Sequence, residues 1–181
     1  MRLRRDEAFL LVVDVQEKLA PHVHGHEQVV SRSAALIRAA SLLGLPVVVS
    51  EHCPDRIGPT VPALSALAPP ALAKTHFACP DEPSIEAALA SLRRRQAVVC
   101  GMEAHVCVLQ TALALLDRGY QPLLVADAVG SRRESDRDVA LERLRAAGCS
   151  IGTAEMAIFE WMGRADRPGF RELLGIVKAL P

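Results

Sequence analysis

Three residues of this 181-residue chain could together carry out nucleophilic chemistry: the thiol of Cys107, the carboxylate of Asp14 and the amine of Lys74. A cysteine thiol is mostly protonated at neutral pH, so it needs a base or a positive field to act as a nucleophile. An acid, a base and a thiol that converge on one cleft have the arrangement that nucleophilic catalysis requires. Spacing alone leaves other roles open: Asp14 as a cap, Lys74 as a solvated edge residue, and Cys107 as an inert core residue.

Cys107 lies between a predicted strand and a predicted helix. Residues 96–101 form a short apolar run that ends in a glycine, which is typical of a buried strand. Residues 108–119 have helical composition and end at Gly119, a residue suited to a left-handed cap. Cys107 would then lie at a helix N-terminus, where backbone N–H groups and the helix dipole favour the thiolate. Position alone favours this role and that of a buried, inert thiol about equally.

Strands and helices alternate along the rest of the chain. Apolar runs predict strands at residues 8–13, 46–50, 72–75, 96–101, 120–127 and 151–153. Helical patterns cover residues 27–43, 83–92, 108–119, 135–147, 153–162 and 168–180, and the proline-rich residues 54–70 predict an ordered loop with one short helical turn. This order predicts an α/β fold: one three-layer α/β/α domain over residues 1–181, Rossmann-like, with a mainly parallel sheet of roughly six strands. Asp14, Lys74 and Cys107 all follow or end strands, where parallel sheets place their functional loops.

Composition excludes several classes of partner. Lys plus Arg and Asp plus Glu both number 21, so no net field favours nucleic acid or an anionic membrane. No apolar run approaches the roughly 20 residues that span a bilayer, and no signal-peptide cleavage site follows the basic start, which predicts a cytoplasmic protein. The five cysteines are an odd number without a C-x-x-C pair, which indicates reduced thiols.

Three segments carry a resemblance to a known family. Residues 11–16 (LVVDVQ), 74–77 (KTHF) and 101–108 (GMEAHVCV) resemble the signature stretches of the isochorismatase-like cysteine hydrolases. Residues 57–62 and 103–111 are similar to the subgroup of isochorismatase-domain-containing and YcaC-like hydrolases, whose substrates are mostly unassigned. The resemblance implies the fold of that family and a catalytic triad of Asp14, Lys74 and Cys107.

The implied reaction is hydrolysis of the C–N bond of a small amide through a thioester on Cys107. Asp14 would take the thiol proton and pass a proton to the leaving amine, while Lys74 holds Asp14 ionised and favours the thiolate. The backbone N–H groups of Glu103 and Cys107 would form the oxyanion hole. The resemblance also implies a cis peptide bond between Met102 and Glu103.

The resemblance argues against a metal or any other cofactor. Nicotinamidase-type relatives bind a divalent ion through an Asp-x-His pair and a further histidine after the second strand. Residues 50–56 read SEHCPDR and lack that pair, so neither a catalytic metal nor nicotinamide is expected. Isochorismate is not expected either, because the enzymes named for it lack the cysteine. His22, His24 and His26 alternate in what reads as a solvated loop rather than a metal site.

The substrate pocket is predicted to include His52, Phe77, His105 and Trp161, although Trp161 also fits a core position or a subunit contact. A small-molecule substrate and a homo-oligomer of two to eight chains are expected, with an interface on residues 153–162 or 54–70. The alternative is a catalytically weak or redox-sensing oligomeric protein in which Cys107 is oxidised. The predicted pairing of Asp14 with Lys74 favours hydrolysis, because a sensor does not need it.

Overall fold

The strands form one parallel sheet at the centre of the molecule. The computed structural model describes residues 1–180, and Pro181, the last residue of the expected domain, lies outside them. The strands are β1 (Ala8–Val13), β2 (Val47–His52), β3 (Leu72–Lys74), β4 (Gln96–Met102), β5 (Gln121–Gly130) and β6 (Ser150–Gly152), in the order β3-β2-β1-β4-β5-β6 with every neighbouring pair parallel. The prediction of a parallel six-stranded α/β fold is confirmed.

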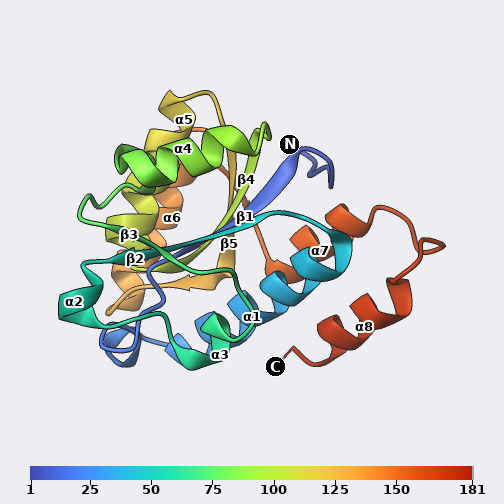
Figure 1. Cartoon of the computed structure of the whole chain (residues 1–181), viewed down its shortest axis with the longest axis horizontal. Helices are drawn as coiled ribbons and strands as arrows, with labels where there is room; N and C mark the ends of the chain where they lie inside the picture. Colours follow the sequence, from blue (N-terminus) through green and yellow to red (C-terminus); the bar gives the residue numbers. More distant parts are fainter. Residues whose placement is uncertain (181) are drawn as a thin grey trace.

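Helices cover both faces of the sheet. The α-helices are α1 (His26–Leu43), α2 (Pro54–Ile57), α3 (Pro62–Ser65), α4 (Pro83–Ser91), α5 (Leu109–Asp117), α6 (Glu134–Ala146), α7 (Ala154–Met162) and α8 (Phe170–Lys178). Figure 1 shows α1, α7 and α8 on one side of the strands and α4, α5 and α6 on the other. No helix among residues 1–180 has the length and apolar character needed to cross a membrane.

The central position of β1 in the sheet explains why its sequence is continuously apolar instead of alternating. All six of its residues are buried. Leu10 and Val12 pack into the core on the α1 side, while Phe9, Leu11 and Val13 pack into the core on the α5 side. A central strand covered on both faces needs apolar residues at every position.

Gly101 allows β4 to approach β1 closely near the active site. Its φ is 121°, and a Cβ atom at this position would lie 2.0 Å from the carbonyl oxygen of Val13. Because Val13 pairs with Gly101 in the sheet, any side chain here would push the two strand ends apart. Asp14 follows Val13, so this close approach also sets the distance from Asp14 to the turn after β4.

Two segments differ from the prediction. The 54–70 segment contains two short helices, α2 and α3, instead of one turn, and each begins at a proline, a residue preorganised for the first helical position. Residues Ala104–Val108 form a π-helical turn, η3, so α5 begins at Leu109 and Cys107 lies inside the wider turn before it. Two 3-10 turns, η1 (Ala20–His22) and η2 (Cys79–Asp81), complete the elements of residues 1–180.

Candidate active site

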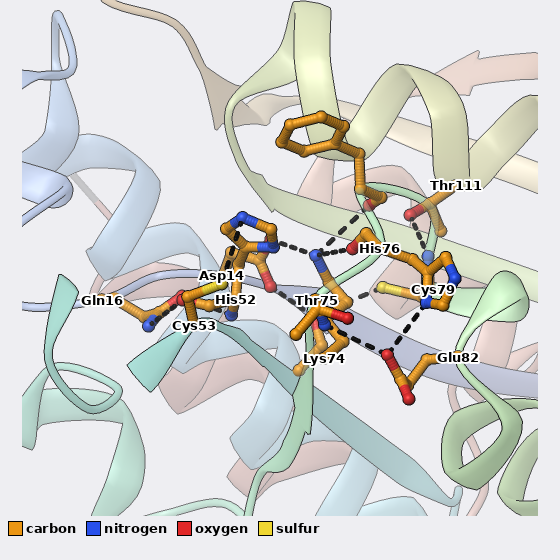
Figure 2. A network of polar contacts seen from close by, with 12 residues as sticks. Asp14, Gln16, His52, Cys53, Lys74, Thr75, His76, Cys79, Glu82 and Thr111 are labelled. Carbon is orange, nitrogen blue, oxygen red and sulfur yellow. Dashed lines mark hydrogen bonds and ion pairs between the residues drawn. The ribbon is translucent and has the colours of Figure 1, made fainter. Parts of the chain in front are cut away.

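A buried ion pair joins the ends of β1 and β3. The Nζ atom of Lys74 lies 2.7 Å from Oδ2 of Asp14, and neither side chain is exposed. Asp14 follows β1 with a φ of 52°, in the left-handed region that non-glycine residues adopt mainly at constrained sites. Lys74 ends β3 and reaches past β2, the strand between the two, to make this contact. Figure 2 shows the pair at the centre of a network of polar side chains.

Lys74 uses all three of its ammonium protons. Besides Asp14, its Nζ donates to the carbonyl oxygens of His76 and Phe77, at 3.1 and 3.2 Å. Burial alone would lower the pKa of Lys74, but the charge of Asp14 and nearby cysteine thiols together raise that pKa above its ordinary value. An ammonium with three fixed acceptors is a permanent cation and not a proton carrier. Asp14 is therefore the base available to a neighbouring thiol.

Cys107 lies beside this pair on η3 and is 6% exposed. Burial, followed by the charge of Asp14, raises the pKa of the Cys107 thiol far above its ordinary value, and the opposing charge of Lys74 does not compensate. Lys74 therefore favours the thiolate, as expected, but burial and the charge of Asp14 outweigh its effect in the resting protein. A buried thiol next to a carboxylate keeps its proton, because both desolvation and the negative charge disfavour the thiolate.

The segment after β5 holds the turn that carries Cys107. The peptide bond between Met102 and Glu103 is cis. Oε1 of the buried Glu103 accepts hydrogen bonds from the backbone N–H and the Nε of Arg132, at 3.2 and 3.0 Å. Nδ1 of His105 lies 2.9 Å from the hydroxyl of Ser131. The roles of Ser131 and Arg132 were not predicted, and no local pattern in the sequence indicates them.

A second donor holds the other oxygen of Asp14. The hydroxyl of Ser50, on β2, donates to Oδ1 of Asp14 at 2.7 Å, and both side chains are fully buried. Each carboxylate oxygen therefore has its own donor. Ser50 was predicted as the last residue of a strand and was given no role in the site. Its position, the first polar residue after the apolar run Val47–Val49, was the available signal.

His52 and Phe77 form an aromatic pair beside the ion pair. Their rings stack with centroids 5.2 Å apart and planes at 25°, and Phe77 is 49% exposed. Burial and the charge of Lys74 lower the pKa of His52, so its imidazole is neutral at pH 7. These two residues, together with His105 on the nucleophile turn, lie at the same end of the sheet as Asp14.

Comparison with known proteins identifies the family. The model of the isochorismatase domain matches residues 8–156 of the chain. The chain belongs to the isochorismatase family. The isochorismatase domain-containing protein 2 of Bos taurus is 41% identical over 178 residues, which cover 98% of this chain and 86% of the relative.

Several solved structures are similar to this chain in fold. The MAR1 ribonuclease of Caenorhabditis elegans is 36% identical with a TM-score of 0.94, and the match covers 100% of this chain and 95% of that one. YcaC from Pseudomonas aeruginosa, solved with hexane-2,5-diol and covalent acrylamide, is 27% identical with a TM-score of 0.90. The match covers 97% of this chain and 91% of that one. YcaC from Escherichia coli, described as an octameric hydrolase of unknown specificity, is 24% identical with a TM-score of 0.86 over 100% and 98% of the two chains, and shows the fold alone.

Trp161 does not join the other predicted pocket residues of this isochorismatase-family chain. Its side chain is fully buried on α7, in the core between the sheet and α1. Cys107 belongs to the core on the opposite face of the sheet. The prediction that Trp161 lines the pocket is wrong, and the alternative of a core position is confirmed, because α7 lies on the other face of the sheet from Cys107.

Residues 1–180 contain no group of three or more His, Cys, Asp or Glu side chains that could hold a metal ion. At the place where nicotinamidase-type relatives bind their ion, Nε2 of His52 lies 3.7 Å from the sulfur of Cys53. Metal independence of the reaction stays a prediction.

Proposed function

We propose that this isochorismatase-family protein is a cysteine-dependent hydrolase that cleaves the C–N bond of a small amide. The observation that carries the proposal is the fully buried Asp14–Lys74 ion pair next to a slightly exposed thiol, Cys107. Burying two opposite charges gives a fold little net stability, so such a pair beside a nucleophile favours a catalytic role. Of the three groups, only Cys107 has accessible surface with which to meet a substrate.

The first half of the reaction forms a thioester. The Cys107 thiol gives its proton to Asp14 as the sulfur attacks the amide carbon, and backbone N–H groups of Glu103 and Cys107 stabilise the oxyanion. The C–N bond then breaks, and Asp14 passes its proton to the leaving nitrogen. Lys74 stays protonated throughout and stabilises the carboxylate form of Asp14.

The second half releases the acid. Asp14 takes a proton from a water molecule, whose oxygen attacks the thioester carbon. The C–S bond breaks, the Cys107 sulfur takes the proton back from Asp14, and the products are a carboxylic acid and an amine or ammonia. His52, Phe77 and His105 form the wall against which a small, partly planar substrate would lie.

The relatives support a reactive thiol and an assembly. The covalent acrylamide of the Pseudomonas aeruginosa YcaC is an electrophile of the kind that thiols attack, and the Escherichia coli YcaC is described as an octameric hydrolase. We propose that this chain is a homo-oligomer, because α7 exposes apolar side chains, and that it is cytoplasmic, as its composition predicts.

The test is turnover of a panel of small aliphatic and aromatic amides, followed by mass spectrometry of the acid product. Cys107→Ala and Cys107→Ser should lose at least about 10³-fold in kcat/KM on any amide that the protein cleaves. Cys149→Ala is the matched control, since Cys149 is also buried but lies outside the site, and it should retain activity. Chelation with EDTA should leave turnover unchanged. Wild-type turnover by Cys107→Ala would refute the mechanism.

Two further arms test other functions. An RNA panel is included because a relative 36% identical is named a ribonuclease, and RNA cleavage without amide cleavage would replace the proposal. Intact-mass analysis after mild peroxide tests the redox-sensing alternative. Reversible oxidation of Cys107 together with no turnover of any amide would favour a sensor.

A further inference from the structure

A chain of buried polar groups continues from Asp14 toward α5. The Ser50 hydroxyl, which donates to Asp14, accepts a hydrogen bond from the Cys79 thiol at 3.3 Å. The backbone N–H of Cys79 donates to the hydroxyl of Thr111 at 2.9 Å. All four side chains are fully buried, and they come from β2, η2, α5 and the end of β1. Figure 2 shows Cys79 and Thr111 in the same network as Asp14 and Lys74.

The direction of these hydrogen bonds follows from the number of protons. Ser50 has one hydroxyl proton, and its oxygen already accepts the Cys79 proton, so its own proton is left for Asp14. Burial and the charge of Asp14 raise the pKa of Cys79 to about 11, which keeps Cys79 a thiol and a donor at neutral pH. The chain therefore delivers a hydrogen bond to the carboxylate in its ionised form.

We propose that Ser50 is a positioning residue of the active site, which holds Oδ1 of Asp14 as Lys74 holds Oδ2, and that Cys79 directs the Ser50 proton toward Asp14. This inference rests on the proposed function, in which Asp14 is the base for Cys107. Two donors on separate oxygens fix the plane of the carboxylate as well as its charge. Thr111 lies one turn beyond Cys107, on the helix α5 that follows it. These polar contacts therefore also connect Asp14 to the segment that carries Cys107.

The structure favours this role over simple core packing. Three apolar residues precede Ser50 on β2, and a fourth would fill the same space without a polar group to satisfy. The Cys79 thiol would then have no hydroxyl to contact. A hydroxyl donor favours an ionised acceptor. Removing the Ser50 hydroxyl should therefore displace the acidic limb of Cys107 reactivity toward higher pH.

The experiment measures the alkylation of Cys107 by iodoacetamide between pH 4 and pH 9, with peptide mapping by mass spectrometry to separate Cys107 from the partly exposed Cys53. Ser50→Ala should move the acidic limb of the rate profile upward by about one pH unit. Ser50→Thr keeps the hydroxyl and should restore the wild-type limb. Cys79→Ala should move the limb in the same direction by a smaller amount, because the Ser50 proton is then less firmly directed.

Ser33→Ala is the matched control. Ser33 is equally buried and bonds a cysteine thiol, that of Cys100, but it does not contact Asp14. It should change stability without moving the limb, whereas a general loosening of the core would move the limb in both variants. Circular dichroism and thermal unfolding confirm that each variant is folded.

The outcomes separate this inference from the proposed function. A limb that stays in place in folded Ser50→Ala, or one that moves as far in Ser33→Ala, overturns the role of Ser50 and leaves the hydrolase proposal standing. A limb that stays displaced in folded Ser50→Thr also counts against it. A wild-type Cys107 that iodoacetamide does not modify at any pH overturns both proposals.

Discussion

The ionisation state of Cys107 decides how a reaction at this site can begin. In the resting protein, burial and Asp14 keep the thiol protonated, and Lys74 is fixed as a cation by three acceptors. Proton transfer to Asp14 must therefore accompany the attack on the substrate instead of preceding it.

The Asp14–Lys74 pair leads to a prediction about stability. Lys74→Met leaves the Asp14 carboxylate buried without its cation, so at pH 7 the free energy of unfolding should fall by about 3–5 kcal/mol. The folded-state pKa of Lys74 lies above its ordinary value of 10.5. Its contribution is therefore complete below pH 10.5 and is lost as the pH rises through the higher folded-state value.

Urea unfolding at pH 7 and at intervals above pH 10 checks this prediction, because the difference between wild type and Lys74→Met should narrow only in the alkaline range. Lys178→Met, at an exposed position, is the control. Equal stability of the two proteins at pH 7 would contradict the role given to the pair.

Among the elements, the loop after β2 is fastened to the segment that follows β1, and the side chain of Gln16 makes several of the contacts. The Gln16 amide donates to the carbonyl oxygens of His52 and Gly58, at 3.1 and 2.6 Å, and accepts from the N–H of His52 at 2.7 Å. An antiparallel bridge between Gln16 and Thr60 adds a second connection. The loop that carries α2 is thereby held beside Asp14, two residues before Gln16, and His52 is held against Phe77.

Gln16→Leu should free this loop. The substitution leaves buried backbone groups of His52 and Gly58 without partners, so we expect a loss of about 2–4 kcal/mol in the free energy of unfolding. Hydrogen exchange followed by mass spectrometry should show faster exchange in residues 52–61 and little change in α6. Gln28→Leu, on the exposed side of α1, is the control. Unaltered exchange of residues 52–61 in the Gln16 variant would show that other contacts hold the loop.

The surface of the whole molecule leaves apolar side chains of α7 uncovered. Met156 is 51% exposed and Phe159 is 36% exposed, while Trp161 and Met162 of the same helix are buried. One face of α7 therefore packs on the core and its other face presents a methionine and an aromatic ring to solvent. These residue types are enriched where subunits meet.

Light scattering at micromolar concentration should give a multiple of the 19.5 kDa chain mass. The double substitution Met156→Glu, Phe159→Glu places charge on the proposed interface. It should break that contact between subunits and lower the measured mass to that of a smaller assembly. Val139→Glu changes an equally exposed apolar residue on α6, on the other face of the sheet, and should leave the mass unchanged. A wild-type mass of one chain would refute the assembly.

The sequence by itself determined the elements of this protein and the candidate residues at strand ends. Continuous apolar runs located the strands, with β1 predicted at Ala8–Val13 as observed, because a strand buried on both faces is apparent from its own residues. The carboxyl-end rule placed Asp14 and Lys74 at one edge of the sheet, and they meet there. The resemblance of three short segments correctly indicated the family.

Only the tertiary structure decided the partners of those residues. Ser50 lies 36 residues from Asp14, and Cys79 lies 32 residues from Thr111, so their contacts depend on strand order and on the path of the chain between strands. Trp161 was misplaced for the same reason, since only the crossover shows which face of the sheet α7 covers. The protonated state of Cys107 likewise depends on burial by distant segments, because desolvation comes from the packed environment and not from residues adjacent in the sequence.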